Sequence, residues 1–530
     1  MKIQSILMSM LVVATLAGCS SEDETNNPPS VIGNQAYVSL KVSTPYGTST
    51  RASSSDKDNA STEENAIHSL YAVTFDVNNN IIAYGTAKAA QVVDITGSKE
   101  NPKAFVVSSN AKGLLLIANP GAQLKTVLEN AQEGMNFNAL NAAITSTTNV
   151  NEIIDNAAKN KGFAMINSGS LVTSDTDASE NATKSLIELK PENIKVVGPE
   201  AGQFDTSEEA KQAAEANRVT VNIERLASKI IFEVKDGGPT VPANAAFAFT
   251  GWALDATNTK FYPWAKKVDT GTSVGGNAGF YTKNFYTIDP NYDGHDGIAY
   301  NKIVDGVPCV PGATNSTEVL TWLADKTSQY SIENTMRAAQ QLFKNATRVI
   351  IKSTYYPDKT WSGDWFSYAG VDYKDLATLK AAYAIPTNVN LQAACNKFFE
   401  KVKDKVTATN FAGLDEAELD AITNGGELVK EDGCIRWYQG GLNYYWYEIR
   451  HDDGITANMA FAKYGIVRNN VYGLTLNSIS KSGTPWYPSV DPEGGEKDPD
   501  PKDPIDEMEG YVGVTVKVMP WIKWNHNIDL

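Results

Sequence analysis

Apolar residues recur at every second position in two short segments near opposite ends of the chain. In the first, residues 36–43, Val38, Leu40 and Val42 alternate with polar residues. In the second, residues 511–521, the alternating residues are Val512, Val514, Val516 and Val518. Successive side chains of a strand point to opposite faces, so each segment predicts a strand with one apolar face. Such a strand needs an apolar partner, and either segment fits the same kind of groove.

Strand patterns also dominate the middle of the chain. Further strands are expected at residues 70–75, 104–107, 114–118, 246–253, 348–353 and 472–479. A polar helix is expected over 208–216, and a new alternation begins at Val219, which predicts a domain boundary near residue 217. Helical spacing, for example at Met336, Leu342 and Phe343, predicts a helical insertion over about 332–424. The fold class expected is therefore mostly β.

Charge and cysteine content narrow the function. The 530 residues carry 46 Lys and Arg against 62 Asp and Glu, a formal net charge of −16, which disfavours nucleic acid as a partner. The chain has four Cys and four His, too few and too dispersed to indicate a cofactor or a metal cluster. Whether Cys309, Cys395 and Cys434 pair or are buried as small apolar residues stays open.

The first residues have the pattern of a targeting segment. Lys2 precedes an apolar run over residues 3–16 that is too short to span a bilayer, and Leu16-Ala17-Gly18-Cys19 follows. This resembles a bacterial lipobox, in which case residues 1–18 are a lipoprotein signal peptide and Cys19 is the acylated (palmitate-bearing) first residue. An ordinary secretory signal is the alternative. The acidic residues 22–24 that follow fit an export signal or a solvated tether.

Two other segments indicate processing and a spacer. The polar loop after the first strand, residues 45–55, carries Arg51 among small residues, and such loops are where proteases cut. A cut between Arg51 and Ala52 releases the first strand and opens its groove. Residues 485–510 are rich in Pro and Asp, and the prolines predict an extended linker that stays out of sheets. The linker leads to the C-terminal strand, residues 511–530, for which pairing within its own chain is the alternative.

No enzyme motif is convincing. Residues 271–275 have the letters of a nucleophile elbow, but they lie in a Gly- and Asn-rich stretch. Asp289, Asn291 and Asp293 open like a calcium loop, yet Tyr300 stands where a bidentate Glu is needed, so a plain turn is the stronger interpretation. An aromatic cluster over residues 437–447 fits either sugar stacking or a strand that is half core and half surface.

Several segments together carry a family resemblance. They are the lipobox, residues 50–52, residues 68–76, residues 221–229, residues 464–472, and the proline-rich linker ending in a strand with Pro520-Trp521. In this order they resemble the type V pilins of Bacteroidales, with the Mfa-like shaft subunits of the FimA/Mfa superfamily nearest. The likeness covers nearly the whole chain, although no single motif is specific.

The resemblance implies two tandem transthyretin-like Greek-key β-sandwich domains, at 52–217 and 218–484. It implies that an outer-membrane lipoprotein precursor loses residues 19–51 to an arginine-specific protease. Val38, Leu40 and Val42 then belong to the displaced strand, and Val512, Val514, Val516, Val518 and Trp521 to the donor strand.

The implied product is a cell-surface fimbria built from copies of this chain, with accessory tip and anchor subunits and a host or bacterial surface receptor. No catalysis is expected. A tip adhesin and a non-polymeric glycan-binding surface lipoprotein are the alternatives.

Overall fold

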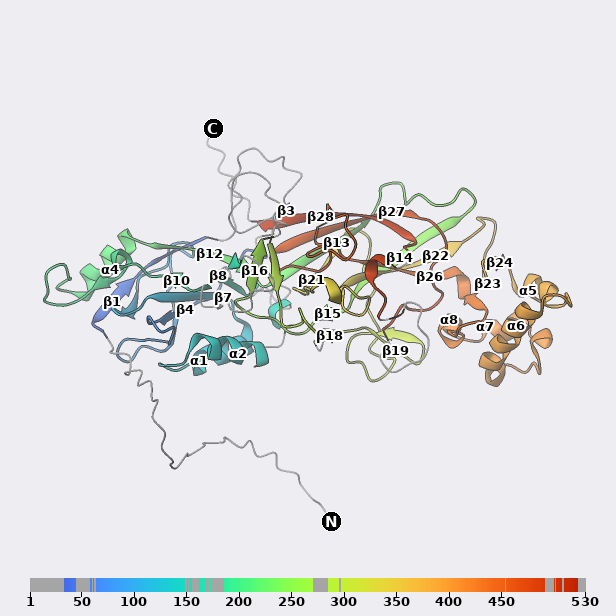
Figure 1. The fold of residues 1–530 in the computed structure, drawn as a ribbon, viewed down its shortest axis with the longest axis horizontal. Coiled ribbons are helices and arrows are strands. Elements are labelled where there is room, and N and C mark those ends of the chain that lie inside the picture. The colour runs from blue at the N-terminus through green and yellow to red at the C-terminus, as the bar shows by residue number, and fades with distance from the viewer. Residues whose placement is uncertain are drawn as a thin grey trace, which may run out of the picture. The chain divides into compact units, whose positions relative to one another are not determined.

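Strands form most of the ordered structure in the computed structural model (Figure 1). The structure describes residues 33–43, 58–59, 61, 63–147, 150, 152–154, 162–167, 171–172, 185–269, 285–294, 297–452, 454–490, 500, 502–507 and 510–522. The mostly β fold expected from the sequence is confirmed. Within these ranges no helix has both the length and the apolar character needed to cross a membrane.

The N-terminal core lies between a mixed sheet and a smaller antiparallel sheet. The mixed sheet runs in the order β2 (Leu40–Ser43), β12 (Val219–Arg225), β8 (Met165–Asn167), β7 (Gly113–Ala118), β4 (Leu70–Phe75) and β5 (Ala90–Val92), and β10 (Ile187–Glu188) pairs with β7. The smaller sheet is β11 (Lys195–Val196), β1 (Gln35–Val38) and β6 (Phe105–Ser108). Alternating side chains such as Leu114, Leu116 and Ile223 fill the space between them.

Helices cover the outer faces of these sheets. Helices α1 (Gly121–Asn130) and α2 (Phe137–Thr147) place Leu124, Leu128 and Leu140 against the other face of the mixed sheet. Helix α4 (Ser207–Ala216) packs Ala210 and Ala214 on the smaller sheet. Thr206 is the N-cap residue of this helix and forms a capping box with Glu209, as a Thr-x-x-Glu sequence favours.

The chain changes sheet at Leu226. Strand β12 still belongs to the N-terminal mixed sheet, and β13 (Ala227–Val234) starts the next one. The change of sheet therefore comes later in the chain than the domain boundary predicted near residue 217. That next sheet runs in the order β21 (Thr327–Ile332), β13, β27 (Asn470–Ile479), β28 (Val512–Ile522) and β3 (Asp58–Asn59). It packs against β14 (Ala246–Asp255), β22 (Arg348–Tyr356) and β26 (Leu442–Glu448) around Phe232, Trp252 and Leu474.

Smaller sheets surround this second core. They are β17 (Phe285–Ile288) with β16 (Lys266–Asp269) and β9 (Leu171–Val172); β15 (Thr257–Asn258) with β18 (Ile298–Ala299); β19 (Lys302–Val304) with β20 (Val307–Cys309); and β24 (Val371–Tyr373) with β23 (Trp365–Tyr368) and β25 (Arg436–Tyr438).

The C-terminal helices lie in the second half of the expected range 332–424 and end just beyond it. They are α5 (Leu376–Tyr383), α6 (Val389–Val402), α7 (Glu416–Asp420) and α8 (Gly425–Leu428). Asp375 caps α5 by accepting a hydrogen bond from the Thr378 N–H, and α6 buries Leu391, Phe398 and Val402. The spacing at residues 336–343 was misleading, because those residues form a loop around a short 3-10 turn, Ala338–Gln340.

The proline-rich linker is not free at its ends. Trp486, Tyr487 and Val490 are buried, and Ile505, beyond residues 491–499, is buried as well. The Ile505 N–H donates to the Gln341 carbonyl. Prolines keep a segment out of a sheet, but they do not stop its aromatic side chains from packing on the core. The linker is therefore packed on the core at both described ends, and its role as a spacer stays a prediction.

Candidate strand-exchange elements

The first strand lies inside the N-terminal core. Val38 and Leu40 are completely buried and Val42 is 2% exposed, while Lys41 between them faces solvent. All three apolar residues belong to the cluster between the two sheets. The alternation in the sequence thus predicted the buried face correctly.

This segment is divided between two sheets at Ser39. Strand β1 pairs antiparallel with β6, whereas β2 pairs parallel with β12, with Leu40 opposite Val219. The Ser39 hydroxyl donates to the Pro102 carbonyl at 3.1 Å and accepts from Arg218 Nη1 at 3.2 Å. The expectation of one continuous strand over 36–43 is wrong in this respect, because the chain passes from one sheet to the other at Ser39 and alternation alone does not reveal such a change.

The C-terminal strand β28 pairs with β27 of its own chain (Figure 1). The pairing is antiparallel, with Val516 opposite Leu474. Val516 is 4% exposed, and the other three alternating valines are only half-buried. Trp521 pairs through its backbone with Asp58, and its side chain lies outside the described residues. Of the two arrangements left open by the sequence, the structure has the intramolecular one.

Local contacts fix the register of β28 on β27. Thr515 Oγ1 accepts a hydrogen bond from Asn477 Nδ2 at 2.6 Å. A bulge between Leu476 and Ser478 brings Ser478 against Gly513, where a Cβ atom would lie 2.3 Å from the Ser478 Oγ. A glycine at this position therefore lets the strand approach β27 closely.

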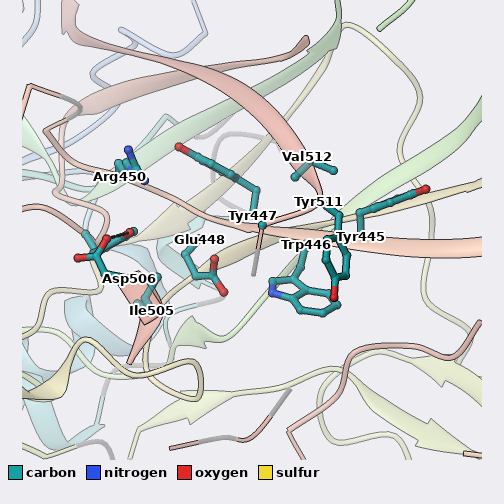
Figure 2. Close-up of a pocket in the computed structure, with 11 residues that line it drawn as sticks. Tyr445, Trp446, Tyr447, Glu448, Arg450, Ile505, Asp506, Tyr511 and Val512 are labelled. Carbon is teal, nitrogen blue, oxygen red and sulfur yellow. Dashed lines mark hydrogen bonds between the residues drawn. The ribbon is translucent and has the colours of Figure 1, made fainter. Parts of the chain in front are cut away.

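The start of β28 forms one wall of a cavity of about 210 Å³ (Figure 2). Tyr511 and Val512 lie on one side, and β26 contributes Trp446 and Glu448. Burial raises the pKa of the Glu448 carboxyl. The sequence predicted either sugar stacking or a strand that is half core and half surface for the aromatic residues of β26. In the structure, Tyr445 is in the core and Trp446 is half-buried at the cavity.

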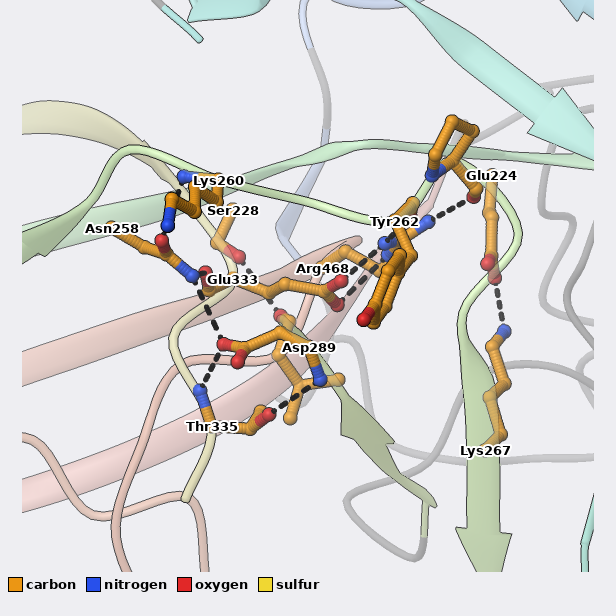
Figure 3. A network of polar contacts seen from close by, with 12 residues as sticks. Glu224, Ser228, Asn258, Lys260, Tyr262, Lys267, Asp289, Glu333, Thr335 and Arg468 are labelled. Atoms are coloured by element: carbon orange, nitrogen blue, oxygen red, sulfur yellow. Dashed lines mark hydrogen bonds and ion pairs between the residues drawn. The ribbon is translucent and has the colours of Figure 1, made fainter. Parts of the chain in front are cut away.

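Buried ion pairs hold the crossing from one sheet system to the other (Figure 3). The Arg468 side chain donates to both carboxylate oxygens of Glu333 and to the carbonyls of Tyr262 and Pro263. Lys267 pairs with Glu224, also buried. A buried charge is costly without its partner, so each of these ion pairs has to stay together. The pairs therefore fix how the segments that carry them pack against one another.

Arg225 is another buried residue whose structural role the sequence did not assign. It donates to the Glu64 carbonyl at 3.0 Å and contacts Asn65 and Asn469. A signal was present, because Arg225 continues the alternation of Val221 and Ile223 and so falls on the buried face. A charged residue at a position that alternation places on the buried face indicates a buried polar contact.

The candidate calcium residues do not converge. Asp289 is buried and accepts from the backbone N–H groups of Asn291 and Thr335, and burial together with the charge of Glu333 raises its pKa. Asp293 instead forms an exposed ion pair with Arg337 at 2.7 Å. In the described ranges no group of three acidic, His or Cys side chains is arranged to hold a metal. The segment is a structured turn.

The three cysteines of the described residues do not pair, and the predicted processing sites are not described by the structure. Cys309, Cys395 and Cys434 are free and buried. Cys19, Arg51 and Ala52 lie outside the described residues, so lipidation and cleavage stay predictions.

Comparison with known proteins identifies two regions of the chain. Residues 36–191 match the family of the major fimbrial subunit protein FimA, and residues 436–527 match the C-terminal family of the type IV major fimbrial subunit protein, fimbrillin. A search of curated protein sequences finds no match.

Solved structures give distant similarities over most of the chain. A fimbrilin (FimA) from Porphyromonas gingivalis is 14% identical with a TM-score of 0.41, covering 94% of this chain and 100% of that one. The tip fimbrial protein Mfa3 from the same organism is 13% identical with a TM-score of 0.32, covering 92% and 100%. A candidate cell adhesion protein from Parabacteroides distasonis is 12% identical with a TM-score of 0.42, covering 92% and 98%. By its two family matches the chain is similar to major fimbrial subunit proteins over residues 36–191 and 436–527.

Proposed function

We propose that this chain is a shaft subunit that polymerises by strand exchange after proteolysis. A lipoprotein precursor acylated at Cys19 is cut between Arg51 and Ala52, and residues 19–51 leave with the first strand. The residues 512–518 of a neighbouring subunit then enter the vacated groove. The observation that carries the proposal is the match between the two strands, residue by residue.

The match covers both faces of the strands. Aligned in the same direction, the pairs are Val38 with Val514, Ser39 with Thr515, Leu40 with Val516, Lys41 with Lys517, and Val42 with Val518. Each inward position keeps an aliphatic side chain of similar volume, which cores tolerate well. The outward Lys41 and Lys517 are both exposed where they now lie, and a hydroxyl is kept at the position of Ser39.

Burial favours the groove over the position that β28 occupies in the uncut chain. At the edge of its own sheet, β28 fully buries Val516 and only half-buries the other three valines. In the groove, the corresponding side chains are buried to 98% or more. Completing the burial of three valines contributes about 2–4 kcal/mol, taking half of the value for full burial of each.

Backbone pairing adds to this preference. The first half of the groove offers partners on both sides, since β1 lies between β6 and β11, and the second half offers β12. In its own sheet β28 has β27 along its length and β3 only at Trp521 and Ile522. We infer that the uncut chain is held as a monomer because its own first strand fills the groove.

The geometry of exchange gives a filament. Donor strand and groove lie on different parts of the subunit, so each contact is heterologous and does not have to close. Tip and anchor subunits of the same family terminate the ends, and an arginine-specific protease starts the reaction. The surface receptor that such a fimbria meets is a further partner.

The test uses the full-length precursor and a trypsin-like protease. Cleaved protein should form an SDS-resistant ladder, and its chains should begin at Ala52. Val516→Asp should abolish the ladder, because the carboxylate has to be buried in the groove. Lys517→Asp is the matched control, since this position faces solvent in both arrangements, and it should leave the ladder intact. A ladder that persists with Val516→Asp contradicts the donor assignment.

A further inference from the structure

The cavity beside Tyr511 and Val512, at the start of β28, contains buried polar atoms that have no hydrogen-bond partner among the described residues. Glu448 Oε1 and Arg450 Nε are both buried, and neither has a hydrogen-bond partner among the described residues. Both residues line the cavity, and Figure 2 shows the Glu448 side chain pointing into the space between Trp446 and Ile505. A buried acceptor and a buried donor without partners cost free energy, so their presence at one cavity indicates a polar ligand.

The neighbouring carboxylate is already satisfied. Asp506 accepts hydrogen bonds from Lys463 Nζ at 2.7 Å, the Tyr464 hydroxyl at 2.8 Å and the Met459 N–H at 2.6 Å. Although burial opposes it, these hydrogen bonds hold the pKa of Asp506 below its usual range. The Arg450 side chain also bonds to Tyr464, so the atoms left for a ligand are Glu448 Oε1 and Arg450 Nε.

Aromatic rings form the other walls. Trp446 is half-buried and packs edge-on against Phe343, with ring centroids 5.9 Å apart, so its position is fixed. Tyr511 lies under the Lys481 ammonium, 4.2 Å from the ring centroid. Rings held in this way offer a flat apolar surface beside the polar pair.

Size and chemistry define the ligand class. A volume of about 210 Å³ holds about seven waters at about 30 Å³ each, the space of a single sugar ring and its hydroxyls. Sugar hydroxyls both donate and accept, so they satisfy a carboxylate and a guanidinium together, and the C–H face of the ring packs on an aromatic side chain. The charged groups that line the cavity are Glu448, Asp506 and Arg450, so the lining has no excess positive charge to favour an anionic ligand. We propose that this cavity binds one neutral sugar residue, with Glu448 and Arg450 as its hydrogen-bonding partners and Trp446 as its stacking surface.

The position of the cavity links this binding to assembly, a step that rests on the proposed function. Tyr511 and Val512 belong to the segment that leaves β27 during exchange, so release of β28 removes a wall of the site. A ligand that binds only the self-paired form stabilises it by mass action. At ten times its dissociation constant, the sugar multiplies the self-paired population about elevenfold relative to the released one.

The binding test is made on the uncut full-length chain and is independent of polymerisation. Saturation-transfer NMR with D-galactose and N-acetyl-D-glucosamine should show saturable binding of at least one. Glu448→Gln should weaken it about tenfold, because a charge-assisted hydrogen bond becomes a neutral one. Glu318→Gln, the same change at an exposed position, should not alter it. The site is refuted if neither neutral sugar saturates, if N-acetylneuraminic acid binds more tightly, or if Glu448→Gln binds like the parent chain.

The assembly test adds the bound sugar at ten times its dissociation constant before proteolysis. Ladder formation should slow about tenfold in the parent chain and by much less in Glu448→Gln. An unchanged rate at saturation contradicts the link between site and strand. If no ladder forms even without sugar, the proposed function fails, while the NMR result still decides the sugar site.

Discussion

Replacing Leu40 with alanine should destabilise the precursor and leave the fibre unaffected. Leu40 is completely buried in the N-terminal core, and Leu→Ala changes at such sites cost about 2–5 kcal/mol. Taking about 3 kcal/mol, amide hydrogens of β6 and β12 should exchange about a hundredfold faster in the uncut Leu40→Ala chain if they exchange by opening of this core. In the fibre, the mutated strand has left and a neighbour's Val516 occupies its place, so these amides should exchange as in the parent fibre.

The matched control is Leu116→Ala. Leu116 is equally buried in the same cluster but stays in the subunit after cleavage. This variant should accelerate exchange in both precursor and fibre. If Leu40→Ala accelerates exchange in the fibre as much as Leu116→Ala does, the first strand has remained in its groove and the reasoning is refuted.

Individual contacts give three further predictions. Gly513→Tyr should speed ladder formation severalfold. The new side chain collides with Ser478 on β27, whereas the aligned position in the groove already accommodates Tyr37. Slower ladder formation would show that the alignment of the two strands is wrong. Burial raises the pKa of Glu427 to about 7 from its ordinary value of 4.5. The folded chain therefore holds the Glu427 proton more tightly than the unfolded chain does. The stability gained from this proton is complete below about pH 4.5 and is lost as the pH rises through 7. Urea unfolding should therefore show Glu427→Gln to be more stable than the parent at pH 8, by about 3 kcal/mol at most, with little difference at pH 4.5, and equal curves at both pH values would contradict this. Arg468→Gln leaves the buried Glu333 carboxylate without its ion pair and should cost about 3–5 kcal/mol in hydrogen-exchange stability, against under about 1 kcal/mol for Lys103→Gln at the exposed pair with Asp94.

Alternation along the chain was sufficient to predict the strands that carry the proposal. Val38, Leu40 and Val42 share a buried face because a strand has a period of two, although Tyr37 and Ser39 of the opposite face are buried as well. Val516 was predicted in the same way. What the pattern could not give was the partner of β28, because one apolar face fits β27 and the groove equally well.

The parts that sequence reasoning missed depend on side-chain contacts between distant residues. At Ser39 the chain changes sheet, and the Ser39 side chain bonds to Arg218 and to the Pro102 carbonyl, neither of which is near it in sequence. The cavity of Glu448 is closed by Tyr511, a contact across the linker. Helical spacing near residue 336 was misleading because Asn345 donates a hydrogen bond to the Gln340 carbonyl and holds a loop there instead.

Disulfide trapping of Val516 tests the central claim most directly. Paired strand positions bring Cα atoms within bridging range, so Leu474→Cys with Val516→Cys should form an intramolecular bond in the uncut monomer and block assembly. Val219 is the strand partner of Leu40, so Val219→Cys with Val516→Cys should join neighbouring subunits in oxidised fibres. Covalent ladders from the second pair, under non-reducing denaturation, are the predicted result. Fibres in which only the first pair forms its bond, inside each subunit, would contradict strand exchange.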